Sequence, residues 1–140
     1  MVVALAAAAC STSPPPAEPP VEIRSDTEPL TTRFPAIGTP DAVTWVTWNS
    51  ASSDVPGPTT YWIDAVVTLP PQTTTALVTT FQPAADGKTP SVHDMLRSAV
   101  PPRPFLTGTA LDAALSTSGW VASAYLDRER NQLVLSAIDD

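Results

Sequence analysis

The distribution of proline divides this chain of 140 residues into two unlike parts. Six of its 17 prolines fall within residues 11–30, where Val21, Ile23 and Leu30 are the only large aliphatic side chains. Proline cannot donate a backbone hydrogen bond, and so few apolar side chains cannot bury enough surface to offset the entropy of ordering the segment. We therefore predict an unfolded, proline-rich stalk over residues 10–33 and a single folded domain over residues 34–140.

Ahead of the stalk, an apolar run ends at the only cysteine of the chain, Cys10. Residues 1–9 are apolar throughout, but they are too few to cross a bilayer whose hydrocarbon core is about 30 Å thick. An apolar segment followed by small side chains is typical of secretory signal peptides. The sequence therefore predicts a signal peptide over residues 1–9.

The segment Ala7-Ala8-Ala9-Cys10 resembles the lipobox of bacterial lipoproteins. In that family the cysteine thiol takes a diacylglyceryl group and becomes the new N-terminus, so the resemblance implies lipidation of Cys10. Two or more acyl chains hold a protein stably at a bilayer without a transmembrane helix. The implied location is the extracytoplasmic face of the cell membrane, and an ordinary secretory signal is the alternative. The layout of anchor, stalk and domain also resembles that of small lipoproteins of GC-rich Gram-positive bacteria.

The charge balance argues against nucleic acid as a partner. Fourteen acidic residues stand against seven basic ones, which gives a formal net charge of −7. A phosphate backbone requires a lysine- and arginine-rich patch, whereas this chain has scattered arginines and a single lysine. Because Cys10 is the only cysteine, the domain contains no disulfide, and its stability must come from packing.

After residue 33 the hydrophobic pattern predicts four strands and three helices. The β-branched and aromatic segments 41–48 and 61–69 are typical of strands, and 120–128 and 132–139 predict a hairpin. Helices are predicted at 71–81, 91–100 and 109–116, the last two from the capping-box spacings Ser91/Asp94 and Thr109/Asp112. The order β-β-α-α-α-β-β indicates a two-layer α+β domain, a roughly four-stranded antiparallel sheet with helices on one face.

The sequence shows no arrangement of residues that indicates catalysis or metal binding. The single histidine, His93, has no G-x-S-x-G partner, and the chain lacks glycine-rich phosphate loops and paired cysteine or histidine ligands. We expect no metal, no cofactor and no enzymatic activity. Two alternatives stay open: a hydrolase that uses two carboxylates, with Asp64 as one of them, and a carrier of a lipid or other hydrophobic small molecule.

The strand face opposite the predicted core is the expected binding surface. Alternation along the strands places Trp62, Asp64 and Tyr125 on that face, with Asp64 as a partly exposed strand residue. Tryptophan and tyrosine are favoured at the anchor points of interfaces. Burial of this face beneath further chain is the alternative. We predict a non-catalytic binding module of the cell envelope whose partner is an envelope protein or a wall polymer; no pattern indicates an oligomeric state.

Overall fold

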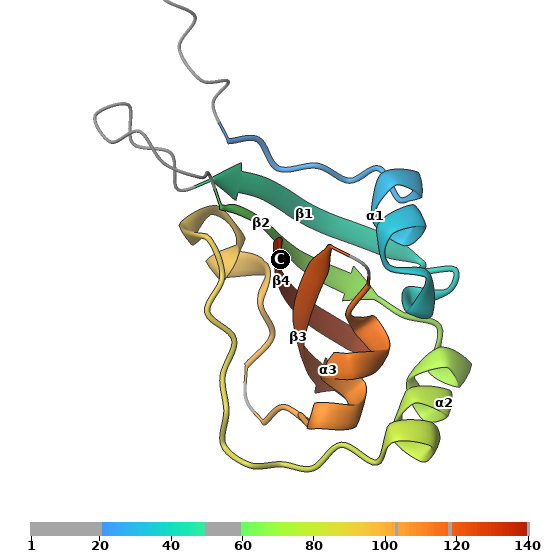
Figure 1. The fold of residues 1–140 in the computed structure, drawn as a ribbon. Helices are drawn as coiled ribbons and strands as arrows, with labels where there is room; N and C mark the ends of the chain where they lie inside the picture. Colours follow the sequence, from blue (N-terminus) through green and yellow to red (C-terminus); the bar gives the residue numbers. More distant parts are fainter. Residues whose placement is uncertain (1–20, 50–59, 103, 118, 140) are drawn as a thin grey trace, which may run out of the picture.

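The computed structural model describes residues 21–49, 60–102, 104–117 and 119–139. The predicted signal peptide, Cys10 and residues 10–20 of the predicted stalk lie outside the described residues and stay predictions. The helices (η marks a 3-10 helix) and strands follow one another along the chain as α1 (Glu28–Arg33), η1 (Pro35–Ile37), β1 (Ala42–Asn49), β2 (Tyr61–Thr68), α2 (Pro71–Phe81), η2 (Asp94–Ala99), α3 (Thr109–Leu115), β3 (Trp120–Asp127) and β4 (Gln132–Asp139) (Figure 1).

A four-stranded antiparallel sheet forms the centre of the fold, with the strand order β1-β2-β4-β3. The turn between β3 and β4 is closed by Asp127, whose Oδ1 accepts hydrogen bonds from the backbone N–H groups of Glu129 and Arg130, each at 3.1 Å. Asn131 completes the turn in the left-handed region (φ 54°), which asparagine tolerates. The predicted α+β class, antiparallel sheet and hairpin are confirmed.

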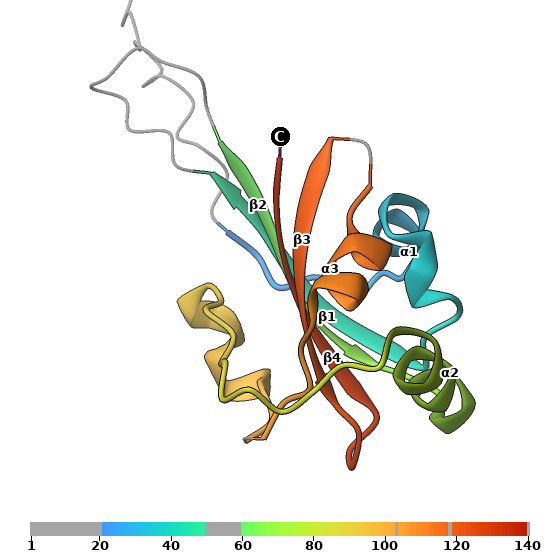
Figure 2. The same cartoon turned by 60° about the horizontal axis from the view of Figure 1, so that its bottom comes forward.

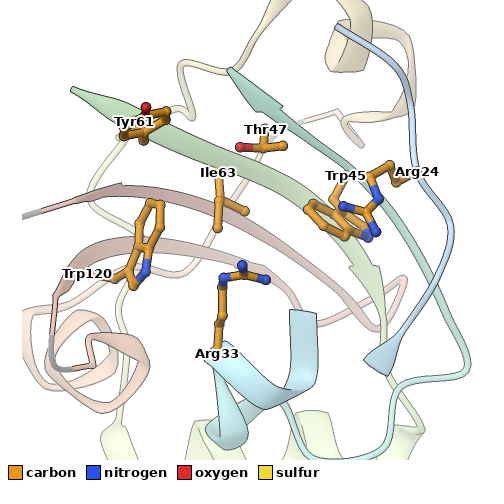
Figure 3. A pocket seen from close by; sticks show the side chains of 7 residues that line it. All are labelled: Arg24, Arg33, Trp45, Thr47, Tyr61, Ile63 and Trp120. Carbon is orange, nitrogen blue, oxygen red and sulfur yellow. The ribbon is translucent and has the colours of Figure 1, made fainter. Parts of the chain in front are cut away.

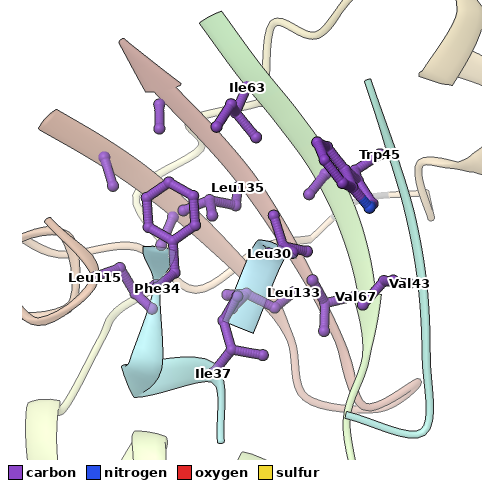
Figure 4. Close-up of a cluster of buried hydrophobic side chains, with 14 of the residues drawn as sticks. Leu30, Phe34, Ile37, Val43, Trp45, Ile63, Val67, Leu115, Leu133 and Leu135 are labelled. Atoms are coloured by element: carbon purple, nitrogen blue, oxygen red, sulfur yellow. The ribbon is translucent and has the colours of Figure 1, made fainter. Parts of the chain in front are cut away.

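The main hydrophobic core lies between the sheet and the layer formed by α1, η1, α2 and α3 (Figure 2). Figure 4 shows the side chains of Leu30, Phe34 and Ile37 packed against the strands. Burying an aliphatic or phenyl side chain stabilises a fold by about 1.5–3 kcal/mol. The buried apolar residues of the helix layer are Leu30, Phe34, Ile37, Leu77, Leu111 and Leu115.

The predicted boundary between a stalk ending at residue 33 and a domain beginning at 34 is wrong. Residues 21–33 belong to the folded unit: the backbones of Arg24 and Trp45 exchange two hydrogen bonds, of 2.7 and 2.9 Å, at the free edge of β1. Leu30 of α1 has no exposed surface and forms part of the main core. One well-placed leucine and one edge-strand pairing thus order a segment whose average composition indicates disorder.

The 3-10 helix η2 packs on the second face of the sheet. This corrects the prediction of helices on one face only. The α-helices do share a face, but η2 and the chain that flanks it pass over the opposite face (Figure 2). There Val66, Phe105 and Val134 form a second, small buried cluster. The alternative of burial beneath further chain therefore applies to part of this face.

The segment predicted as a helix at 91–100 is the shorter 3-10 helix η2. Its N-cap is His93, whose Nδ1 accepts a hydrogen bond from the backbone N–H of Met95 at 3.2 Å. The predicted Ser91/Asp94 capping box is therefore wrong. A histidine ring nitrogen supplies the acceptor that the first turn requires.

The helix α3 begins at the predicted residue, Thr109, but without a side-chain cap. Asp112 Oδ1 instead accepts a hydrogen bond from the N–H of Ala124 (2.8 Å), and Ser116 Oγ accepts one from the N–H of Ala122 (2.9 Å). Both N–H groups belong to β3, an edge strand, and an unpaired edge invites pairing with another chain. The predicted Thr109/Asp112 capping box is wrong because the Asp112 side chain binds the edge strand β3 instead of capping α3.

Candidate ligand-binding site

A recess of about 180 Å³ opens on the core face of the sheet, at the end where β1 finishes and β2 and β3 begin (Figure 3). The helix layer reaches it only through the last residue of α1. Residues from five segments line the recess: Arg24, Arg33, Trp45, Thr47, Tyr61, Ile63 and Trp120. Two guanidinium groups, three aromatic rings and a threonine hydroxyl therefore meet in one small space.

The sheet register explains how three strands contribute to the recess. Thr47 lies directly opposite Ile63, and Tyr61 precedes Ile63 by two residues on the same face. Trp120 of β3 pairs with Asp139 of β4, whose Oδ1 accepts a hydrogen bond from the N–H of Tyr61 (2.7 Å). Because β4 lies between β2 and β3, the backbones of Tyr61 and Trp120 are separated by two strand spacings, about 10 Å. Asp139 lies between these two residues on β4, so a ring-sized group in the recess would lie over Asp139.

Arg24 and Trp45 form one wall as a fixed unit. The Arg24 guanidinium carbon lies 4.2 Å from the centroid of the Trp45 ring, a cation–π contact. Trp45 Nε1 donates to the backbone oxygen of Asp26 at 2.9 Å, and Arg24 Nε donates to Asp26 Oδ1 at 3.0 Å. The Arg24 hydrogen bond holds the pKa of the Asp26 carboxyl below its ordinary value. The charge of Arg24 is therefore already balanced by Asp26.

Arg33 brings a second cation into the recess, and this one has no acidic partner in the part of the chain that the structure describes. It is the last residue of α1, and its side chain points into the recess (Figure 3). Its Nη1 donates to the backbone oxygen of Pro29 at 3.3 Å. Among the described residues, no carboxylate oxygen lies within 4.0 Å of its guanidinium nitrogens. Arg33 thus offers charge and N–H donors to a ligand.

Tyr61 and Trp120 supply aromatic surface that solvent can reach. Tyr61 is 46% exposed, and Trp120 is partly buried with its ring edge-on to Phe34 at a centroid distance of 6.4 Å. The described lining contains no carboxylate, histidine or cysteine that could serve as a general base. Its composition is that of a binding site for a ligand with a negative charge and an amphipathic body.

The three residues predicted to form a binding surface lie on one face of the sheet but do not form one exposed patch. Trp62 is partly buried and stacks on Trp48, with centroids 4.3 Å apart and planes at 10°. Tyr125 is partly buried, edge-on to Phe105 at 6.2 Å. Asp64 is only 1% exposed, so the expectation of a partly exposed strand residue is wrong.

The Asp64 carboxylate is buried because three donors from different parts of the chain surround it. Trp48 Nε1 and the backbone N–H of His93 donate to Oδ2 at 2.8 and 2.9 Å, and Ser136 Oγ donates to Oδ1 at 2.8 Å. The carboxylate thereby joins β1, β4 and the segment that leads into η2. Its hydrogen bonds join these segments, and Asp64 lines none of the three recesses described in this section.

A row of apolar side chains crosses the same face beyond Asp64. Cross-strand pairing places Trp48 beside Trp62, Trp62 beside Ile138, and Ile138 beside Val121. Val121 is 49% exposed and Ile138 is 36% exposed. This row is the part of the predicted binding face that remains open, although the predicted Asp64 and Tyr125 do not belong to it.

Tyr125 also borders a smaller recess of about 150 Å³. Burial, followed by the negative charge of Asp112, raises the pKa of the Tyr125 hydroxyl. Asp112 is already engaged with the backbone of β3 and so has a structural role. A third recess, beside Pro104 and Arg128, measures about 180 Å³. A cavity for a drug-sized or lipid-sized ligand needs roughly 300 Å³ or more, which exceeds each of these three recesses.

No protein-family model, curated protein or solved structure matches this chain. Within the described residues, no helix has the length and apolar character needed to cross a membrane. Over the same residues, no three histidine, cysteine, aspartate or glutamate side chains gather closely enough to hold a metal ion. A functional assignment must therefore come from the chemistry of the residues themselves.

Proposed function

We propose that this protein is a lipid-anchored, extracytoplasmic binding module of the cell envelope that acts without catalysis. The observation that carries the proposal is the recess of aromatic rings, hydroxyls and an unpaired guanidinium, built on a rigid sheet and lined by no general base among the described residues. Its volume of about 180 Å³ suits one ring-sized unit. A stable protein–protein interface buries about 1,600 Å² in total, so a polymer of ring-shaped units, a wall polysaccharide, is the partner that fits this site best.

The anchoring part of the proposal predicts that Cys10→Ser releases the protein from the membrane. Acyl chains supply the membrane affinity, and removing the thiol removes their attachment point. Cell fractionation should find the unaltered protein with membranes and the serine variant in the soluble extracytoplasmic fraction. Mass spectrometry of the unaltered protein should show a diacylglyceryl group on Cys10. A serine variant that stays with the membranes, or an unmodified cysteine, would contradict the anchor.

The binding part predicts that Tyr61→Ala weakens binding of solubilised wall polysaccharide. Loss of one aromatic contact is worth about 0.5–1.5 kcal/mol, a roughly 2- to 12-fold increase in Kd. Tryptophan fluorescence measures the Kd directly, since Trp45 and Trp120 line the recess. Val121→Ala is the matched control because Val121 is exposed to a similar extent (49% against 46%) on the opposite face. If Val121→Ala weakens binding and Tyr61→Ala does not, the site lies on the opposite face and not in the recess.

A further inference from the structure

We propose that the recess binds a single carboxylated sugar unit and that Arg33 is the partner of its carboxylate. This inference rests on the proposed binding function and names the chemistry of the ligand at the same site. Three properties of the recess carry it: its net charge, the mixture of groups that line it, and its size.

The charge of the recess matches one carboxylate. The charge of Arg24 is balanced by Asp26, whereas Arg33 has no carboxylate within 4.0 Å among the described residues. An arginine fork binds a carboxylate through two parallel N–H···O bonds. A phosphate monoester would bring nearly two negative charges to one unpaired cation. Asp139, which lies on β4 between Tyr61 and Trp120 and accepts the N–H of Tyr61, repels a dianion more strongly than a single carboxylate.

The mixture of lining groups matches a sugar ring better than an acyl chain. Tyr61 and Trp120 present aromatic surface, and Thr47 and Tyr61, which both carry hydroxyls, line the same space. A pyranose ring has C–H faces that pack on aromatic rings and O–H edges that pair with hydroxyls and guanidinium groups. An acyl chain would desolvate those hydroxyls without replacing their hydrogen bonds to water, and each such loss costs affinity.

The size of the recess limits the ligand to one unit. A volume of about 180 Å³ is below the roughly 300 Å³ of a site for drug-sized molecules. The recess is open to solvent on one side, since Tyr61 is 46% exposed. A polymer can therefore place one carboxylated sugar unit in the recess while the neighbouring sugar units continue outside.

Titration of the full chain with four small probes tests the inference. The readout is the shift of the indole N–H signals of Trp45 and Trp120 in NMR spectra. D-Glucuronate carries both the ring and the carboxylate, glucose the ring alone, octanoate the carboxylate on an acyl chain, and glucose 6-phosphate a dianion. Glucuronate is a small ligand of some thirteen heavy atoms and should bind with a Kd of about 1 mM. The other three probes should bind at least roughly fivefold more weakly.

Variants of Arg33 separate its charge from its shape. Arg33→Gln should weaken glucuronate binding by about tenfold or more and leave glucose binding unchanged. Arg33→Lys keeps the charge but loses the two-pronged geometry, so its loss should be smaller, about threefold. Arg97→Gln is the matched control, since Arg97 is an exposed arginine that pairs with Asp94 on η2, away from the recess. Thermal unfolding of each variant checks that the fold is retained.

Any one of four results would overturn the inference. Equal binding of glucose and glucuronate, or unchanged glucuronate binding in Arg33→Gln, would show that no carboxylate is recognised; tighter binding of octanoate or glucose 6-phosphate would assign the recess to an acyl or phosphorylated ligand. If wall polysaccharide still shifts the Trp120 signal in those cases, the proposed function stands and only the ligand class is wrong. If neither the polysaccharide nor any probe shifts it, the proposed function fails as well.

Discussion

Replacing Asp64 with alanine is expected to lower the free energy of unfolding by about 3 kcal/mol and the Tm by roughly 12–24 °C. The substitution leaves two partly buried donors, the indole N–H of Trp48 and the backbone N–H of His93, without their acceptor. A buried donor that loses its partner costs about 1–3 kcal/mol, whereas the Ser136 hydroxyl can rotate toward another acceptor. Urea denaturation and thermal unfolding measure the loss.

Asp64→Asn is the matched control for the hydrogen-bond explanation. Its side-chain oxygen can accept from Trp48 and His93, while its NH₂ group donates to the Ser136 oxygen, because a hydroxyl can accept as well as donate. The expected loss is therefore smaller, about 1 kcal/mol, as for one weakened hydrogen bond. An asparagine variant as unstable as the alanine variant would show that the negative charge, and not the set of acceptors, holds the site together.

Much of the sheet could be predicted from the sequence because strand signals are local. The segments 61–69 and 132–139 alternate apolar side chains with a period of two, and turn residues separate them from their neighbours. The strands β2 and β4 occupy nearly those residues. Their pairing with each other follows from no local pattern, since it brings together residues as distant as Asp64 and Ser136.

The capping predictions failed where tertiary structure competes for the same side chain. The spacing Thr109-x-x-Asp112 is a valid capping box by sequence. In the fold, however, the backbone N–H of Ala124 at the edge of the sheet donates a hydrogen bond to the Asp112 carboxylate. The carboxylate therefore does not cap the helix. No sequence pattern reports that this strand is an edge strand or that α3 lies beside it.

The recess could not be predicted because two of its residues come from the segment predicted to be unfolded. Arg24 and Arg33 reach Trp45 and Trp120 only when residues 21–33 pack on the sheet. One partial signal was present: Tyr61 shares a strand face with Ile63, so alternation alone places it at the end of the core-facing row. An aromatic residue at that position marks where the core gives way to solvent.

A helical spacing of apolar residues continues across the predicted stalk boundary. It indicates folded structure in a region whose average composition indicates disorder. Leu30, Phe34 and Ile37 stand at positions i, i+4 and i+7, the spacing of one apolar helix face. All three are buried together in the main core. The proline content of residues 11–30 lowers the average hydrophobicity of the window without disturbing this short stripe, which begins at its last residue.

Leu30→Ala is accordingly expected to lower the free energy of unfolding by about 3 kcal/mol, since truncating a buried leucine removes its packing and leaves a cavity. Ile23→Ala, in the same segment, should change it by less than about 0.5 kcal/mol because Ile23 is 50% exposed and Leu30 is 0% exposed. Urea denaturation of both variants measures the difference. Because α1 carries Arg33 into the recess, Leu30→Ala should also weaken ligand binding, whereas Ile23→Ala should not. Equal midpoints for both variants and the unaltered protein would mean that residues 21–33 unfold independently of the sheet, and the recess would then lose both of its arginines.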